Sequence, residues 1–210
     1  ETRADRPGAR APRGRAGLPW ETVPGVTLCF SMVVHPQVSA EDEGSLYLAA
    51  LLGLGDALGA ANKLWWPDEV HDRSARLAAI GIDSELDGER LTWAVINVCV
   101  DDGRPDRART LAGITAAIEV RLGEAPESVA AQAAARCATL GHRVRARMIP
   151  LGPAGPVTEG IARTCLPDGA LSITTDSGAG VAVRPQHLGM LDLVADNEQP
   201  VRPGEWGPPS

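Results

Sequence analysis

The sequence predicts an α/β (α+β) protein in which a mixed sheet flanked by helices precedes a small antiparallel β-barrel. Three observations support this class. Long apolar segments in the first half are rich in β-branched residues, which is typical of buried strands. Other segments place apolar residues at helical spacing. After Gly141 short apolar runs alternate with turn residues, which is typical of small barrels.

Length and charge narrow the function classes. The 210 residues are enough for one ordinary domain and a small second one, and 44% hydrophobic residues can form a core. A formal net charge of −7 argues against a general binder of nucleic acid or of membrane surfaces. No apolar run reaches the length of a membrane-spanning helix.

The four cysteines are Cys29, Cys99, Cys137 and Cys165, and they form no C-x-x-C pair. Widely spaced cysteines of this kind are expected to be free thiols in a reducing compartment, so we expect a cytoplasmic protein. The histidines show no zinc-ligand spacing either, and no zinc site is expected.

The first elements are a strand and a helix. Residues 1–12 are rich in Arg, Pro and Gly and predict a flexible arm. The run Val26–Val34 predicts a buried strand. Residues 39–42 (Ser-Ala-Glu-Asp) resemble a capping box, which predicts a helix that reaches Leu58.

The next stretch, residues 63–70, reads Lys-Leu-Trp-Trp-Pro-Asp-Glu-Val. Pro67 biases Trp66 away from the helical region, so the residues alone indicate a rigid turn with two half-buried tryptophans.

A strand hairpin is predicted after this turn. Leu77–Asp83 and Leu91–Val100 are the strands, and Asp87-Gly88 is the turn signal between them. Asn97 lies within the second strand, where an amide must either face solvent or hold a partner such as a ligand. The length of this second strand makes it a candidate edge for a homodimer.

The remaining chain divides at about residue 140. Helices are predicted at 111–122 and 126–140, the second closed by Gly141. Residues 195–210 are rich in Pro, Gly and acids and predict a disordered tail. The barrel strands are expected at 144–149, 157–164, 170–174, 180–183 and 190–194.

Residues 13–17 (Arg-Gly-Arg-Ala-Gly) leave two interpretations open. They can belong to the basic arm, or they can form a loop that closes on a ligand. In the second case the glycines supply freedom and Arg13 and Arg15 neutralise a phosphate or carboxylate.

This order of elements and motifs, from about Arg13 to Val194, resembles the biotin–protein ligases of the biotin/lipoate ligase superfamily. The family's loop G-R-G-R-x-G-R, followed by x-W, corresponds to residues 12–20, where Gly14 and Arg15 are kept. The family's K-W-P-N-D corresponds to residues 65–69 (Trp-Trp-Pro-Asp-Glu), where Trp66, Pro67 and the acidity are kept but the lysine and the asparagine are lost.

Two further motifs match with changes. The family's K-x-A-G-I-L-V-E becomes residues 76–83, with Arg76 in place of the lysine and Ala79 in place of the glycine. The family's G-I-N-V-N becomes residues 95–99, which keep Asn97 but carry Val95 in place of the first glycine. The family's Ser-Thr-Asn segment, which holds biotin, has no match in this sequence.

The resemblance implies a fold and a reaction. It implies a class II synthetase-like ligase domain at 13–140 and an SH3-like barrel at 141–194. The implied enzyme forms biotinyl-adenylate from biotin and ATP with Mg²⁺, then transfers biotin to a lysine of a biotin carboxyl carrier domain. Catalysis of this kind depends on positioning and charge neutralisation.

The resemblance also implies the site residues. Arg15 and Arg76 would be catalytic, and Asn97 would position the Mg²⁺–phosphate group. The residues implied to bind biotin and ATP are Arg13, Gly14, Arg15, Ala16, Trp66, Asp68, Arg76 and Asn97.

Three other interpretations stay open at this point. Loss of both motif lysines suits a catalytically impaired pseudoenzyme that serves as a binding or regulatory module. A ligase for lipoate or octanoate is a second, and a domain that shares only the fold is a third.

Overall fold

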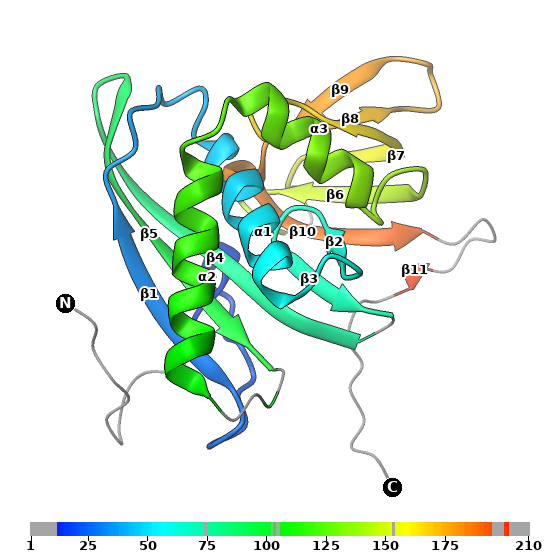
Figure 1. The fold of residues 1–210 in the computed structure, drawn as a ribbon. Coiled ribbons are helices and arrows are strands. Elements are labelled where there is room, and N and C mark those ends of the chain that lie inside the picture. The colour runs from blue at the N-terminus through cyan, green and yellow to red at the C-terminus, as the bar shows by residue number, and fades with distance from the viewer. Residues whose placement is uncertain are drawn as a thin grey trace, which may run out of the picture.

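The computed structural model describes residues 12–73, 75–101, 103, 106–152, 154–194 and 200–201. Figure 1 shows two sheets and three helices, with the helices packed on one side of the larger sheet. The predicted α/β class with a second, smaller β unit is confirmed. The predicted arm at 1–12 and tail at 195–210 lie almost entirely outside the described residues.

The larger sheet has five strands in the order β1-β5-β4-β3-β2. All the strand pairs of this sheet are antiparallel, so the prediction of a mixed sheet is wrong. The reason is that short turns join β2, β3, β4 and β5 in succession, and a short turn can join only antiparallel neighbours. β5 lies between β1 and β4, so the strand Leu91–Val100 is not a free edge for a dimer. The strands are β1 (Leu28–Val34), β2 (Lys63–Trp65), β3 (Glu69–Asp72), β4 (Ala75–Asp87) and β5 (Arg90–Val100).

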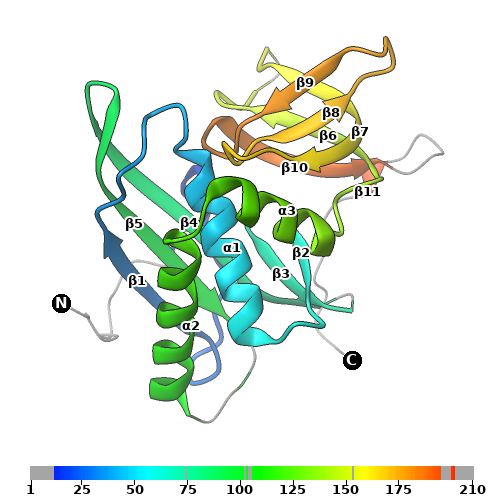
Figure 2. The same ribbon diagram turned by 45° about the horizontal axis from the view of Figure 1, so that its top comes forward.

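Three helices cover one face of this sheet, as both ribbon views show (Figures 1 and 2). They are α1 (Gly44–Leu58), α2 (Arg107–Leu122) and α3 (Pro126–Arg136). α1 is buried along most of its length, because it lies between the sheet, α2 and α3. The part of the chain that the structure describes holds no helix that could span a membrane.

The second sheet has six antiparallel strands in the order β11-β10-β6-β7-β8-β9, and it curves round on itself (Figure 2). A short 3-10 turn, η2 (Pro185–His187), precedes β10. Its strands are β6 (Arg143–Met148), β7 (Val157–Cys165), β8 (Leu171–Thr174), β9 (Gly180–Val183), β10 (Leu188–Val194) and β11 (Pro200–Val201).

One hydrophobic cluster runs through both sheets. Leu52 of α1 and Ile80 of β4 belong to the same cluster as Val144 and Ile173 of the second sheet. The two sheets and the helices between them therefore share one core.

Three predicted helix boundaries differ from the structure, and one of them is the start of α2, which lies at Arg107 rather than at residue 111. The Ser39 hydroxyl accepts a hydrogen bond from the Asp42 amide, but this closes a turn, and α1 begins at Gly44. α3 ends at Arg136, because the Ala138 amide donates to the Leu64 carbonyl and draws the chain towards β2.

Candidate functional site

The larger sheet has an open face on the side away from the helices. On β5, Ile96 and Val98 point into the helical core, so Val95, Asn97 and Cys99 point to the opposite side. Gly81 of β4 lies directly opposite Asn97 in the ladder. We call this side the open face.

The segment 12–20 folds back on itself and lies on the open face. The Trp20 amide donates to the Pro12 carbonyl at 2.8 Å, and the Gly14 amide donates to the Leu18 carbonyl at 2.8 Å. A Cβ added at Gly81 would lie 3.0 Å from the Cα of Gly14, so the loop touches β4 at this point. In Figure 1 this dark blue segment lies behind the sheet.

Within this loop the predicted residues have different surroundings. A Cβ at Gly14 would overlap the indole ring of Trp20, so a larger residue would displace that ring. The exposed Arg13 donates to the Gly17 carbonyl at 2.8 Å. Ala16 is the middle residue of η1 (Arg15–Gly17). The loop is therefore held in place by contacts within the chain.

Arg15 joins the loop to both sheets. Its Nε lies 3.0 Å from Asp68 Oδ2, and the two side chains are 12% and 16% exposed. Its Nη1 donates to the carbonyls of Leu188 at 2.7 Å and Gly189 at 2.9 Å. Burial raises the pKa of Asp68, and the neighbouring Arg15 charge only partly opposes this. Arg15 therefore binds protein groups on three sides.

Arg76 of β4 forms a polar cluster with Glu69 and His71 of β3. Its Nη1 is 3.3 Å from Glu69 Oε1, and the other Glu69 oxygen is 2.8 Å from His71 Nε2. Burial acts to raise the pKa of Glu69, but the His71 hydrogen bond and the Arg76 charge outweigh it and lower that pKa.

The same cluster continues into the second sheet through aromatic contacts. The Trp65 ring lies 5.5 Å from the ring of His71 and 6.3 Å from that of His142, measured between centroids. The sequence analysis missed both histidines. His71 follows Glu69 by two residues, which places both side chains on one face of a strand, and this spacing was the available signal.

Asn97 holds partners on both sides. Its Oδ1 accepts a hydrogen bond from the Ser31 hydroxyl at 2.6 Å, and its Nδ2 donates to Asp83 Oδ2 at 2.9 Å. The sequence left two alternatives for this amide, and the structure shows the second: Asn97 holds partners, which here are protein side chains. The amide nitrogen faces the Asp83 carboxylate, and the amide oxygen faces the Ser31 hydroxyl.

Trp66 is directed into the protein. It is 2% exposed, its indole nitrogen donates to the Gly169 carbonyl at 3.0 Å, and its amide donates to Thr139 Oγ1 at 2.9 Å. The expectation of two half-buried tryptophans is wrong for Trp66, because these contacts dock it between the two sheets. Trp65 is the partly exposed one.

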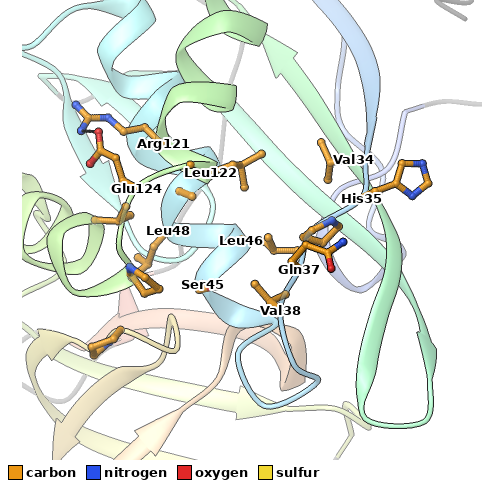
Figure 3. Close-up of a pocket in the computed structure, with 16 residues that line it drawn as sticks. Val34, His35, Gln37, Val38, Ser45, Leu46, Leu48, Arg121, Leu122 and Glu124 are labelled. Carbon is orange, nitrogen blue, oxygen red and sulfur yellow. Dashed lines mark hydrogen bonds and ion pairs between the residues drawn. The ribbon is translucent and has the colours of Figure 1, made fainter.

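A cavity of about 490 Å³ lies on the helical side, between the start of α1, the end of α2 and the segment after β1 (Figure 3). Its lining is mainly aliphatic, and its two charged residues, Arg121 and Glu124, form an ion pair at 2.8 Å. None of the predicted site residues lines this cavity.

The protein has the fold of the biotin protein ligases. The Aquifex aeolicus biotin protein ligase, solved with biotin and ATP, superposes with a TM-score of 0.66 at 19% identity, covering 87% of this chain and 84% of that one. The Helicobacter pylori biotin acetyl coenzyme A carboxylase synthetase, with biotinylated ATP bound, gives 0.53 at 16% identity and 81% coverage of each chain.

A third structure with this fold is a biotin protein ligase-like protein of unknown function from Silicibacter sp. TM1040. It gives a TM-score of 0.61 at 16% identity, covering 76% of this chain and 79% of its own. No family model matches the sequence, and no curated protein is significantly similar to it.

Proposed function

We propose that this protein is an enzyme of the biotin–protein ligase type, which activates biotin with ATP and transfers it to a lysine of a carrier domain. The observation that carries the proposal is the segment 12–20, closed over the open face beside Asn97 in a chain with the ligase fold. A loop in this position shields a reactive mixed anhydride from water.

The proposed reaction has two steps. An oxygen of the biotin carboxylate attacks the α-phosphorus of ATP, and pyrophosphate leaves. The amine of the acceptor lysine then attacks the acyl carbon and loses its proton, and AMP leaves. Mg²⁺ would neutralise phosphate charge beside Asn97 and Asp83. Neither step needs a nucleophile from this chain, so its residues act by positioning and charge.

Arg76 is the residue that we assign to the carboxylate and the nucleotide. It is 27% exposed at its side chain, and Glu69 holds its guanidinium by one contact of 3.3 Å, so part of the fork is free to bind an anion. Arg15 closes the loop by binding Asp68 and the second sheet, and Arg13 and Asp68 complete the loop side of the site.

A second candidate is a binding or regulatory module that has kept the fold without catalysis. The observation in its favour is the same Arg15, whose Nε and Nη1 both bind protein groups. Val95 and Ala79 also add side chains to the open face where the resemblance implies glycines.

The two candidates are separated by titration calorimetry and an adenylate assay. Biotin is titrated into the protein with Mg²⁺ and a non-hydrolysable ATP analogue, and pyrophosphate release is measured with ATP. The ligase proposal expects micromolar binding that Arg76→Ala weakens about 10-fold or more, and release of pyrophosphate. Arg109→Ala, an exposed residue of α2 on the helical side, is the matched control.

The outcomes are distinct. Binding without pyrophosphate release supports the binding module. Absence of binding to both biotin and nucleotide contradicts the ligase proposal. Lipoate and octanoate are titrated under the same conditions, and a preference for either would reassign the acyl substrate.

A further inference from the structure

Cys29 and Cys99 face each other across two neighbouring strands. β1 and β5 are antiparallel, and Cys29 lies directly opposite Cys99 in their register. The two sulfur atoms are in direct contact. Opposed residues in such a pair have Cα atoms about 4.5–5.5 Å apart, within the range that a disulfide spans. The backbone therefore already has the spacing that a bond between them requires.

The two thiols differ in their surroundings. Cys99 is 5% exposed, whereas Cys29, on the edge strand, is partly exposed. The hydrogen bond with Cys29 raises the pKa of Cys99, and burial and the nearby Asp101 raise it further. Cys29 is therefore the sulfur that a reagent in solution meets first, and Cys99 keeps its proton until the second step.

We propose that Cys29 and Cys99 form a reversible disulfide on the open face by exchange with a low-molecular-weight disulfide. The Cys29 thiolate attacks one sulfur of that reagent, its S–S bond breaks, and one thiolate leaves. Cys99 gives up its proton and attacks the Cys29 sulfur, which releases the second thiolate. The two cysteines lose two electrons and two protons, and the reagent becomes two thiols.

The bond would lie next to the site proposed above. Cys99 is opposite Ala79 of β4, and Ala79 is opposite Glu69 of β3, which binds Arg76. A disulfide between β1 and β5 restrains the positions of these two strands. The row of paired residues continues from Cys99 through Ala79 to Glu69, so the restraint acts beside Arg76. If the proposed function holds, the redox state of the pair changes ligand affinity at Arg76.

The second cysteine pair, Cys137 and Cys165, has similar exposure but lies against the core shared by the two sheets. Cys137 follows α3 and Cys165 ends β7, and the 5% exposed Cys165 lies in the shared core. The hydrogen bond from Cys165, together with those from Thr139 and the Trp66 backbone, lowers the pKa of Cys137 to about 6 against the effect of burial. That thiolate is held by protein donors, and it serves as an internal comparison in the experiment.

The test treats the full-length protein with defined ratios of oxidised to reduced glutathione, under native conditions. Remaining thiols are alkylated, and the peptides are mapped by mass spectrometry. The expected product is a linked pair of peptides containing Cys29 and Cys99, lighter by two hydrogen masses and reversed by dithiothreitol. Alkylation of both cysteines at every ratio overturns the proposal, as does a mixed disulfide that persists on Cys29.

Two variants test the order of the steps. Cys99→Ser is expected to accumulate glutathione on Cys29, and Cys29→Ser is expected to leave Cys99 free. Oxidation should raise the thermal midpoint of the wild-type protein by several degrees and leave that of Cys29→Ser unchanged. Glutathione on Cys99 but not on Cys29 would overturn the assignment. None of these measurements uses biotin or ATP, so they do not depend on the ligase proposal.

Discussion

The guanidinium of Arg15 lies 3.0 Å from the carboxylate of Asp68, and the same side chain donates to two carbonyls at the start of β10. One residue of the loop thus holds three parts of the chain together: the loop, the turn before β3 and the second sheet. Arg15 is a structural residue in this conformation as well as a candidate for the site.

The first prediction concerns this ion pair. Arg15→Ala leaves the Asp68 carboxylate buried without its partner, and it should lower the free energy of unfolding by about 3–5 kcal/mol. Urea unfolding measures the change. Arg13→Ala, two residues earlier and exposed, should change the same quantity by less than about 0.5 kcal/mol. Equal effects from the two variants would show that the contacts of Arg15 carry no special stability.

The second prediction concerns pH and Glu69. Its pKa is lower in the folded protein than in the unfolded chain, so its contribution is present above the unfolded pKa and is lost as pH falls through the folded pKa. Glu69→Gln should cost about 1 kcal/mol at neutral pH. The difference from wild type should shrink below about pH 4, near the unfolded pKa of Glu.

Urea unfolding between pH 3 and 7 checks this, with Glu119→Gln on the exposed side of α2 as the control for loss of one negative charge. A difference for Glu69→Gln that stays constant over the whole range would contradict the assignment to the His71 and Arg76 contacts.

The third prediction concerns the close approach at Gly81. A methyl group there meets the Gly14 backbone at 3.0 Å, so Gly81→Ala should displace the loop and cost about 1–3 kcal/mol. Gly113→Ala meets open space on the exposed side of α2 and should stabilise the protein by about 0.5–1 kcal/mol. Thermal unfolding shows whether each variant is less or more stable than the wild type. Hydrogen exchange at residues 12–20 shows whether the loop has been displaced. Unchanged exchange in Gly81→Ala would refute the contact.

The fourth prediction concerns Val95. If the open face binds ligand, its side chain occupies space beside Asn97, and Val95→Gly should raise biotin affinity about 10-fold. Val33→Gly is the matched control, because Val33 lies opposite Val95 in the ladder and is 63% exposed. Calorimetry measures both. A gain in both variants, or in neither, would remove Val95 from the determinants of affinity.

Local sequence patterns predicted most of the fold. The strand Leu91–Val100 and the turn at Asp87-Gly88 correspond to β5 and to the hairpin with β4, because apolar runs and turn residues act over a few positions. The partner on the other side of β5 is β1, and no local pattern contains that pairing. The pairing of β1 with β5 depends on how the strands pack against the helices, and a local sequence pattern does not contain that information.

The sequence motifs named single residues of the candidate site, but they did not indicate which of these residues lie close together. Arg15 and Asp68 belong to separate motifs, 53 residues apart, and only the folded chain shows that they pair. His142 approaches Trp65 from the turn before β6, and its neighbours in the sequence do not indicate this contact. Asn97 was recognisable because an amide in an apolar strand needs partners, although the identity of Ser31 as one partner was not.

The contacts of Arg15 also set an order of events during synthesis. Arg15 and Leu188 are 173 residues apart, so the ribosome makes the loop long before it makes the carbonyls that the loop binds. At about 5–20 residues per second, the loop waits for many seconds without its final partners. The helices and the larger sheet can assemble during that interval. The contacts of Arg15 with the second sheet are thus among the last that this early segment can form.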